Sequence, residues 1–473
     1  MTTASGLVEL QELSVAEAGA LLRAGRLTSL ELTEDALGRI ARLDPLLHSF
    51  VLVTADLARR RAEQADRELA AGRDRGPMHG IPYALKDIFA TAGIPTTSNS
   101  RLMVDHVPEQ DSGVEERLRD GGAVLLGKLA THEFALGGPS FELPFPPARN
   151  PWDRERFPGA SSSGSGAAVA AGLVRVAIGS DTSGSIRGPA CHCGVVGLKP
   201  TFGLVSRRGA FPLSYSLDHV GPVARTVHDA ALALRVIGGP DERDPAGAGV
   251  EPGDLTSTLD AGVAGLRIAY GRDLIAGDPA TAPEVLAAID GAVESLRALG
   301  ARVDEVTLPP FELFNAVGRV IMAAEGYTIH ERWLRDRPTD YGRYTYQRLV
   351  PGAGLTAADL VQAQRLRRLL AGRMTREVLT EHCALILGSS LAPAARFADF
   401  TRDWPPPRAA AATQTIVANV TGHPSLGVPA GLSSEGLPLG LQLIGRAFDE
   451  ATVLRIGAAV ERRLTPALRP PGY

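Results

Sequence analysis

The sequence predicts an α/β protein in which helices pack on the faces of a β-sheet. Short apolar segments of strand length alternate with longer segments of helical periodicity, and this alternation runs through most of the chain. Apolar residues make up 44% of the 473 residues and charged residues 22%, as is ordinary for a protein with a substantial core. The chain therefore has the length and the apolar content to bury a large sheet.

The segment 1–75 is predicted to be an N-terminal helical segment. Ser14 and Thr28 each begin a capping box, in which a hydroxyl and a Glu three residues later satisfy the first amides of a helix. A third helix is expected over residues 54–71, where the helical pattern ends at a glycine.

A buried strand is then expected to carry charged residues into the interior. Residues 80–85 form a short apolar run that leads directly into Lys86 and Asp87. Ser112 is expected to begin the next helix, and residues 123–126 form another short strand.

The second half of the chain continues the alternation. Residues 238–265 are rich in Gly, Pro and Asp, and we interpret them as a surface loop within one large domain, residues 1–473. Strands are predicted over 266–270, 303–308, 384–387 and 439–444, and helices over 283–299, 311–335, 356–382, 408–418 and 449–463.

Composition and charge exclude several classes of protein. A net charge of −4 gives no electrostatic reason to bind nucleic acid or an anionic membrane surface. Three cysteines are too few for a disulfide framework. Residues 1–13 lack the basic and apolar regions of a secretory signal, and no segment approaches the roughly 18 uninterrupted apolar residues of a membrane-spanning helix. We therefore expect a cytoplasmic protein with neither a nucleic-acid nor a membrane partner.

Lysine occurs at only three positions, Lys86, Lys128 and Lys199, against 46 arginines. In such a background arginine serves wherever a fixed positive charge is sufficient. A lysine can lose its proton near neutral pH when it is removed from water, whereas a guanidinium stays charged. Each lysine is thus a candidate for a chemical role, although Lys128 and Lys199 are expected to be structural.

Residues 158–190 contain the segment most indicative of chemistry. Two Gly/Ser-rich clusters flank an expected helix (165–172) and an expected strand (174–179). Small residues let several backbone N–H groups point at one spot, as an oxyanion hole requires. A flexible linker has a similar composition, but apolar secondary structure between the clusters argues against one.

Other templates fit the sequence poorly. No serine has glycine at both −2 and +2, and no lysine lies three residues after a serine, so two common serine-hydrolase motifs are absent. Residues 122–128 superficially match a P-loop but lack the terminal Ser or Thr and have the apolar interior of a strand. Residues 191–193, Cys-His-Cys, are too close together for a closed metal site and have no second ligand pair, so buried structural cysteines are expected.

Several motifs together resemble the amidase signature family. They cover most of the chain outside residues 265–400, and they are 80–87 (Gly-Ile-Pro-Tyr-Ala-Leu-Lys-Asp), 158–172, 179–190, 197–201 (Gly-Leu-Lys-Pro-Thr), 216–222, 419–424 and 436–442. The resemblance implies the amidase signature fold, a large mixed β-sheet covered on both faces by α-helices. It also implies a signature core at 80–225 that holds the catalytic residues.

The resemblance assigns roles to three residues. In the family a lysine and two serines form the catalytic triad, and the serines lie 24 positions apart, which selects Ser161 as the partner of Ser185. Ser185 is then the nucleophile, Lys86 the base, and Ser161 the bridging serine that relays the proton, preceded by a cis peptide bond. A serine hydroxyl is a weak nucleophile until a neighbouring base takes its proton.

The groups around the triad follow from the same resemblance, which implies no metal and no cofactor. Asp181 and Arg187 are expected to support the loop. The backbone N–H groups expected to hold the oxyanion are those of Thr182, Ser183, Gly184 and Ser185. Ala160, Ser163 and Ser183 stand where the family usually has glycine, and a positive φ at position 183 would make serine there costly.

Three functions are compatible with these features. The first is an amidohydrolase that cleaves a small-molecule amide, or a carbamate or urea-like bond, through a Ser185 acyl-enzyme. The alternative is the amidase (glutaminase) subunit of a tRNA-dependent amidotransferase, which residues 179–222 also resemble. The third is a non-catalytic scaffold, against which the intact lysine and serines argue. The expected partner is a small-molecule amide, and the oligomeric state stays open, with a homodimer as one option.

Overall fold

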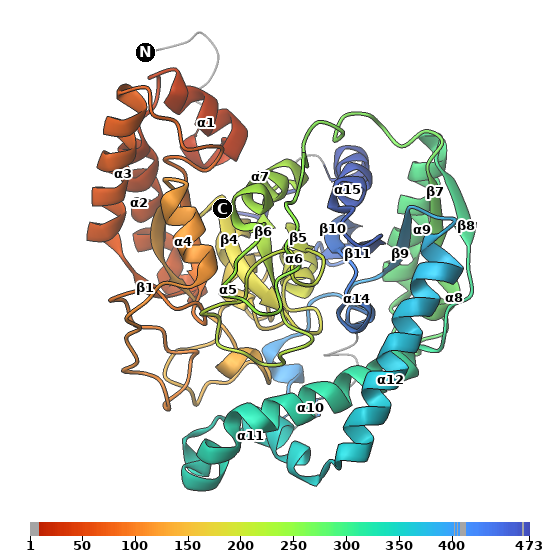
Figure 1. Ribbon diagram of the computed structural model, residues 1–473. Helices are drawn as coiled ribbons and strands as arrows, with labels where there is room; N and C mark the ends of the chain where they lie inside the picture. The colour runs from red at the N-terminus through yellow and green to blue at the C-terminus, as the bar shows by residue number, and fades with distance from the viewer. Residues whose placement is uncertain (1–8, 402, 404, 407–412, 466–467) are drawn as a thin grey trace.

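A computed structural model describes residues 9–401, 403, 405–406, 413–465 and 468–473. Eleven strands form one mixed sheet in the order β1-β3-β2-β4-β6-β5-β10-β11-β9-β7-β8, so that β1 and β8 are its two edges (Figure 1). The strands are β1 (Phe50–Val53), β2 (Pro82–Lys86), β3 (Val124–Leu129), β4 (Val176–Asp181), β5 (Val196–Lys199), β6 (His219–Ala224), β7 (Arg267–Tyr270), β8 (Arg302–Glu305), β9 (Ala384–Gly388), β10 (Ser425–Leu432) and β11 (Pro438–Gly445). The α/β prediction with a large mixed sheet is confirmed.

Helices accompany the strands through the chain. They are α1 (Val15–Arg23), α2 (Ser29–Leu47), α3 (Ala55–Ala70), α4 (Gly113–Asp120), α5 (Ser163–Ala170), α6 (Arg187–Cys193), α7 (Val227–Ile237), α8 (Arg272–Ala276), α9 (Pro283–Ala298), α10 (Phe311–Asp336), α11 (Arg343–Leu349), α12 (Ala357–Arg373), α14 (Ile416–Thr421) and α15 (Glu450–Leu464). A π-helical segment, Met374–Leu379, follows α12 directly.

Around β2 and β4 the sheet separates two hydrophobic cores. Along β2, Tyr83 and Leu85 belong to the core that contains α7, α9 and α15, whereas Ala84 belongs to the core that contains α2, α3 and α5. Val176 and Ala177 divide in the same way along β4. Because successive side chains of a strand point to opposite faces, helices cover both faces of this part of the sheet.

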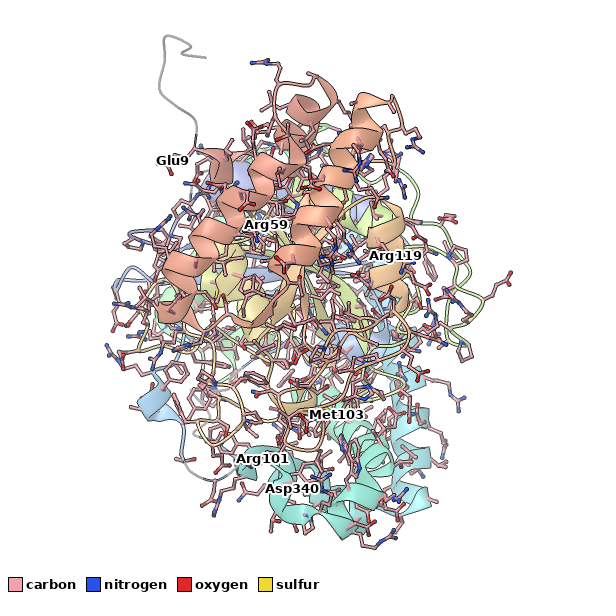
Figure 2. All side chains as sticks on the ribbon, turned by 90° about the vertical axis from the view of Figure 1, so that its left-hand side faces the viewer. Glu9, Arg59, Arg101, Met103, Arg119 and Asp340 are labelled. Atoms are coloured by element: carbon pink, nitrogen blue, oxygen red, sulfur yellow. The ribbon has the colours of Figure 1, made fainter. Side chains whose placement is uncertain are left out.

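The N-terminal segment contains the predicted helices and one strand that the sequence pattern missed. Both predicted capping boxes are present, with Ser14 and Thr28 as the caps. On the surface Arg59 of α3 donates to Glu34 of α2 at 2.6 Å (Figure 2). Between these helices β1 pairs with β3 at the sheet edge, so the segment 1–75 is not helical throughout.

Differences from the predicted elements have local causes. Ser112 precedes α4, as predicted, but its side chain makes no capping bond, and the side chain of Glu115 binds Arg61 and Tyr83. The predicted helix over 408–418 falls partly on residues outside the described ones, and α14 begins at Ile416.

Residues 238–265 contain no helix and no strand, in agreement with the predicted loop. Leu255, Leu259 and Val263 are nevertheless buried against the core, so part of this loop lies beneath the surface. The assignment of the whole chain to a single domain stays a prediction.

Candidate active site

Two parallel neighbours in the sheet bring the predicted lysine and the second Gly/Ser cluster together. β2 ends at Lys86 and β4 ends at Asp181, and the two strands pair in parallel. The carboxyl ends of adjacent parallel strands meet at the same edge of a sheet, where α/β proteins commonly bind ligands. The chain leaves β4 through residues 182–186 and enters α6, which places Ser185 at this edge.

Lys86 is fully buried and has two hydroxyl partners. Its Nζ donates to Ser161 Oγ at 2.7 Å and to Ser180 Oγ at 2.9 Å. Burial lowers the pKa of Lys86 to about 7, although the charges of Asp218 and Asp181 act in the opposite direction. A large fraction of Lys86 is therefore a neutral amine at neutral pH, which can accept a proton.

The structure brings all three predicted catalytic side chains together. Ser185 Oγ accepts a hydrogen bond from the backbone N–H of Ser161 at 3.3 Å, while the hydroxyl of Ser161 faces Lys86. Ser161 and Ser185 are 2% and 7% exposed, and both line a cavity of about 620 Å³. Two serine hydroxyls thus lie at the wall of the pocket, and the hydroxyl of Ser161 contacts the amine of Lys86 behind it.

The conformation of the loop depends on glycine at position 184. Gly184 has φ +123°, and a Cβ added there would overlap the hydroxyl of Thr415. Ser183 does not have positive φ, so serine at that position is not strained. The same is true of Ala160 and Ser163, and the glycines replaced at these three positions are therefore not required by the backbone conformation.

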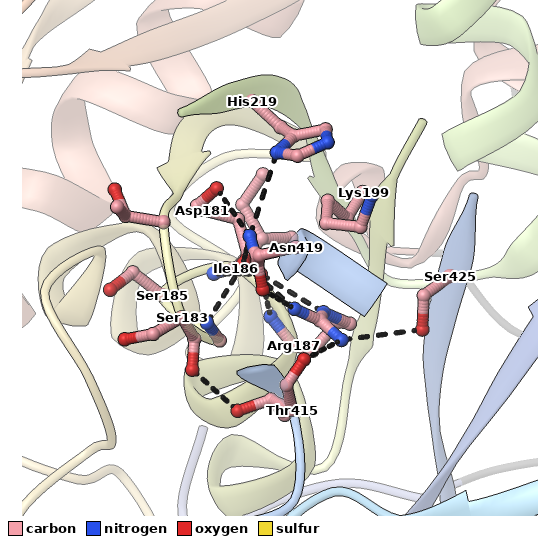
Figure 3. Close-up of polar contacts among 12 residues, drawn as sticks. Asp181, Ser183, Ser185, Ile186, Arg187, Lys199, His219, Thr415, Asn419 and Ser425 are labelled. Carbon is pink, nitrogen blue, oxygen red and sulfur yellow. Dashed lines mark hydrogen bonds and ion pairs between the residues drawn. The ribbon is translucent and has the colours of Figure 1, made fainter. Parts of the chain in front are cut away.

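Asp181 organises the loop through a buried ion pair (Figure 3). Its carboxylate accepts from the amide N–H of Gly184 at 2.8 Å and of Ile186 at 3.1 Å. Arg187 donates to it through Nη2 at 2.8 Å and Nε at 3.0 Å. Burial alone would raise the pKa of Asp181, but the Arg187 charge and its hydrogen bonds hold that pKa well below its usual range.

Arg187 extends this network to distant parts of the chain. It donates to the carbonyl of Thr415 at 2.8 Å, to Gln442 Oε1 at 2.6 Å and to Asn419 Oδ1 at 2.6 Å. Asp181 and Arg187 therefore tie the loop to α14 and β11, which is the geometry expected of loop support.

One of the four N–H groups predicted to hold the oxyanion already donates a hydrogen bond within the loop. The N–H of Gly184 donates to Asp181, so it points at a carboxylate and away from a developing oxyanion. Within the described part of the chain, the N–H groups of Thr182, Ser183 and Ser185 have no hydrogen-bond acceptor. The oxyanion role of these three groups stays a prediction.

Two side chains that contact the predicted site residues, the hydroxyl of Ser180 and the carboxylate of Asp218, were not predicted from the sequence. Ser180 lies in the quoted motif 179–190, but nothing in the pattern indicates that its hydroxyl contacts Lys86. Asp218 lies in the motif 216–222 and accepts from Thr182 Oγ1 at 2.6 Å. Burial raises the pKa of Asp218, against the hydrogen bonds that it accepts.

The outer wall of the cavity comes from α10 and α11, which Figure 1 shows below the sheet. Charged groups of both signs line it, namely Arg319, Arg348, Glu312 and Asp278. Burial lowers the pKa of Arg348 to about 9, and the charge of Arg319 acts in the same direction.

The other two lysines are structural, as expected. Lys128 is buried and its Nζ lies 3.2 Å from Asp87 Oδ1, and it donates to the carbonyl of Phe89 at 2.8 Å. Lys199 is buried and donates to the carbonyls of Pro200 at 3.0 Å and His423 at 2.6 Å. Residues 122–128 are not a P-loop, in agreement with the prediction of a strand, because Lys128 lies inside β3.

The Cys-His-Cys segment lies in α6, where both cysteines are buried. Burial raises the pKa of Cys191 to about 11, so its thiol stays protonated. Among the described residues, no group of three or more His, Cys, Asp or Glu side chains has a geometry that could hold a metal ion. In the same part of the chain, no helix is both long and apolar enough to cross a membrane.

Comparisons with known proteins identify the family. The amidase family model matches residues 31–454. The chain is 40% identical to a glutamyl-tRNA(Gln) amidotransferase subunit of Anaeromyxobacter sp. (strain K), covering 98% of each chain. The chain belongs to the amidase signature family, and is an enzyme of the class that hydrolyses carbon–nitrogen bonds.

Solved structures agree with this assignment. The peptide amidase from Stenotrophomonas maltophilia has a TM-score of 0.85 and 35% identity, covering 98% of this chain and 99% of the other. A vestigial protein complex, described as revealing the origins of an s-triazine catabolic enzyme, has a chain with a TM-score of 0.89 and 34% identity, covering 97% and 100%.

Proposed function

We propose that this chain hydrolyses an amide bond through an acyl-enzyme on Ser185. The observation that carries the proposal is the 2.7 Å hydrogen bond from Lys86 Nζ to Ser161 Oγ, made by a lysine whose burial lowers its pKa to about 7. Ser185 lies beside this pair at the wall of a cavity large enough for a small-molecule substrate.

The proton moves along this line of groups. As Ser185 Oγ attacks the amide carbonyl, its proton passes to Ser161 Oγ, and the proton of Ser161 passes to the neutral Lys86. The N–H groups of Thr182, Ser183 and Ser185 hold the negative charge that develops on the carbonyl oxygen. Lys86 then returns the proton through Ser161 to the leaving nitrogen, so the C–N bond breaks and the amine departs. Water cleaves the acyl-enzyme by the same route and restores Ser185.

The substrate that we place first is glutamine, whose ammonia would be passed to partner subunits of an amidotransferase. The 40% identity to an amidotransferase subunit over almost the whole chain supports this choice over the stand-alone hydrolase placed first from the sequence. The charges at the cavity wall also support glutamine. The arginines of α10 and α11 suit the carboxylate of an amino acid, and the carboxylates of Glu312 and Asp278 suit its ammonium group.

The second candidate is a stand-alone amidase acting on small or peptide-like amides. The 35% identity and TM-score of 0.85 to a peptide amidase support it. So does the cavity of about 620 Å³, which offers more space than one glutamine side chain needs.

A panel of hydrolysis assays tests the proposal and separates its two forms. The purified chain is given glutamine, simple aliphatic and aryl amides, an ester and a carbamate, and ammonia or amine release is measured against Lys86→Ala, Ser161→Ala and Ser185→Ala. We expect each variant to abolish turnover while circular dichroism stays unchanged. Full activity of Ser185→Ala refutes the mechanism.

Purification from the source cell decides between the two forms. Two co-purifying partner subunits and a preference for glutamine support the amidotransferase form. Robust hydrolysis of simple amides by a monomer or homodimer supports the stand-alone enzyme. A fluorophosphonate probe that leaves Ser185 unlabelled would point instead to the non-catalytic scaffold. A cytoplasmic location belongs to the same proposal, and fractionation of the source cell tests it.

A further inference from the structure

Ser183 is a cavity-lining residue that the mechanism uses only through its backbone. It lies two residues before Ser185, is partly exposed, and stands where the amidase signature family usually has glycine. Its backbone does not require glycine, because its φ is not positive. The side chain is therefore an unstrained addition next to the nucleophile.

The backbone that carries Ser183 is held rigidly. Its carbonyl accepts a hydrogen bond from Thr415 Oγ1 at 2.5 Å, and the next amide, that of Gly184, donates to Asp181 Oδ1 at 2.8 Å. Thr415 also packs so closely against Gly184 that no Cβ fits there. These contacts fix the backbone of Ser183, so the rotamer of its side chain alone decides where in the cavity its hydroxyl points.

The hydroxyl of Ser183 has no hydrogen-bond partner within the part of the chain that the structure describes. Other hydroxyls of the site are engaged, since Ser161 and Ser180 accept from Lys86 and Thr182 donates to Asp218. In Figure 3 the side chains of Ser183 and Ser185 extend toward the same side of the loop, away from Arg187. Two hydroxyls therefore reach one cavity from one rigid turn.

We propose that Ser183 determines substrate specificity by hydrogen-bonding a polar substituent next to the scissile carbonyl. The chemical class is a small amide with a hydroxyl or amino group on the carbon adjacent to the carbonyl. Ser183 and Ser185 line the same cavity, so an amide attacked by Ser185 places the substituent on its neighbouring carbon in the cavity that also holds the Ser183 hydroxyl, which can donate to it or accept from it. This inference rests on the proposed attack by Ser185 and concerns the second candidate, the stand-alone amidase, because the carbon next to the side-chain carbonyl of glutamine carries no polar substituent.

A matched pair of amides tests the inference. Lactamide and propionamide differ only in the hydroxyl on the carbon next to the carbonyl, and kcat/KM is measured for both. We expect the wild type to prefer lactamide, and we expect Ser183→Ala and Ser183→Gly to lose about three- to tenfold more of kcat/KM for lactamide than for propionamide, as fits the removal of one hydrogen bond. Ser183→Thr, which keeps the hydroxyl, should retain the preference.

Ser390→Ala is the matched control. Ser390 also lines the cavity, but its hydroxyl is buried, so this variant should change both amides equally. No preference for lactamide in the wild type, or an equal loss on both amides in Ser183→Ala, overturns the role of Ser183. Hydrolysis that persists in Ser185→Ala refutes the proposed function instead, so the two failures are distinguishable.

Discussion

Amide hydrolysis should weaken as the pH falls below about 7, because the proposed base must be neutral to accept a proton. Burial lowers the pKa of Lys86 to about 7. A base with that pKa is about half neutral at pH 7 and about 1% neutral at pH 5. We therefore expect kcat/KM to rise about 100-fold between pH 5 and a plateau above pH 8.

The assay is the initial rate of ammonia release from an uncharged amide between pH 5 and 9, at constant ionic strength. The dependence of kcat/KM reports the free enzyme, so the pKa of the substrate complex does not enter. Circular dichroism at each pH shows that the loss is not unfolding.

A second buried group titrates in the same range and must be distinguished from Lys86. Burial raises the pKa of Glu133 to about 7, and Glu133 holds the amide of Gly342 just before α11. The charge of Asp218 raises the pKa of Lys86, so Asp218→Asn should move the acid limb to lower pH if Lys86 is responsible. The pKa of Glu133 is shifted mainly by its burial and by its hydrogen bonds with Ser100, Gly342 and Thr345, so a limb that belongs to Glu133 should stay in place in Asp218→Asn.

Three results would refute this reasoning. They are a flat profile from pH 5 to 9, a rate that increases as the pH falls, and a limb that Asp218→Asn leaves in place. Lys86→Arg is the complementary variant, because a guanidinium stays charged and cannot act as the base. It should lose about 10²- to 10⁴-fold of kcat, and retention of a tenth of the wild-type rate contradicts the role.

Two further predictions concern the loop. Gly184→Ala forces a side chain into a left-handed conformation against Thr415, and should lower the free energy of unfolding by about 2–4 kcal/mol in denaturant titrations. Gly188→Ala is its control, since the nearest atom to the new Cβ is 3.6 Å away, and an equal loss in both variants contradicts the argument. Arg187→Leu leaves Asp181 buried without its cation and should cost about 3–5 kcal/mol of stability. In a chain of this length a loss of 1 kcal/mol lowers the melting temperature by about 1 °C, so a thermal unfolding curve within about 1 °C of wild type would show that the pair is not needed.

The sequence predicts the triad because its members lie in short motifs with fixed spacing. Ser161 and Ser185 each lie in a run of small residues, and Lys86 ends an apolar strand. The contact between Lys86 and its second acceptor, the hydroxyl of Ser180, cannot be predicted in this way. Ser180 reaches Lys86 because β2 and β4 are neighbours, and an apolar pattern does not contain the order of strands in a sheet.

Contacts between segments far apart in the sequence could not be predicted either, because the apolar pattern does not show which segments become neighbours in the fold. Thr415 lies 232 residues from the Ser183 carbonyl that it holds, and its own segment contains nothing that indicates a loop contact. The strands β5, β6 and β10 were not predicted because Gly and Pro interrupt their apolar runs, as Gly221 and Pro222 do in β6. In the folded sheet, those residues pair with Gly179 and Ile178 of β4.

The burial of Lys86, Lys128 and Lys199 has a practical consequence for covalent labelling. These are the only lysines in the chain, so its surface presents no ε-amine to acylating dyes, amine-reactive cross-linkers or activated supports. Conjugation through such reagents should leave the lysines of the folded protein unmodified. A small acylating compound that enters the cavity would instead meet the hydroxyls of Ser161, Ser183 and Ser185, and mass spectrometry of the digested adduct would locate the modified serine without a background of lysine products.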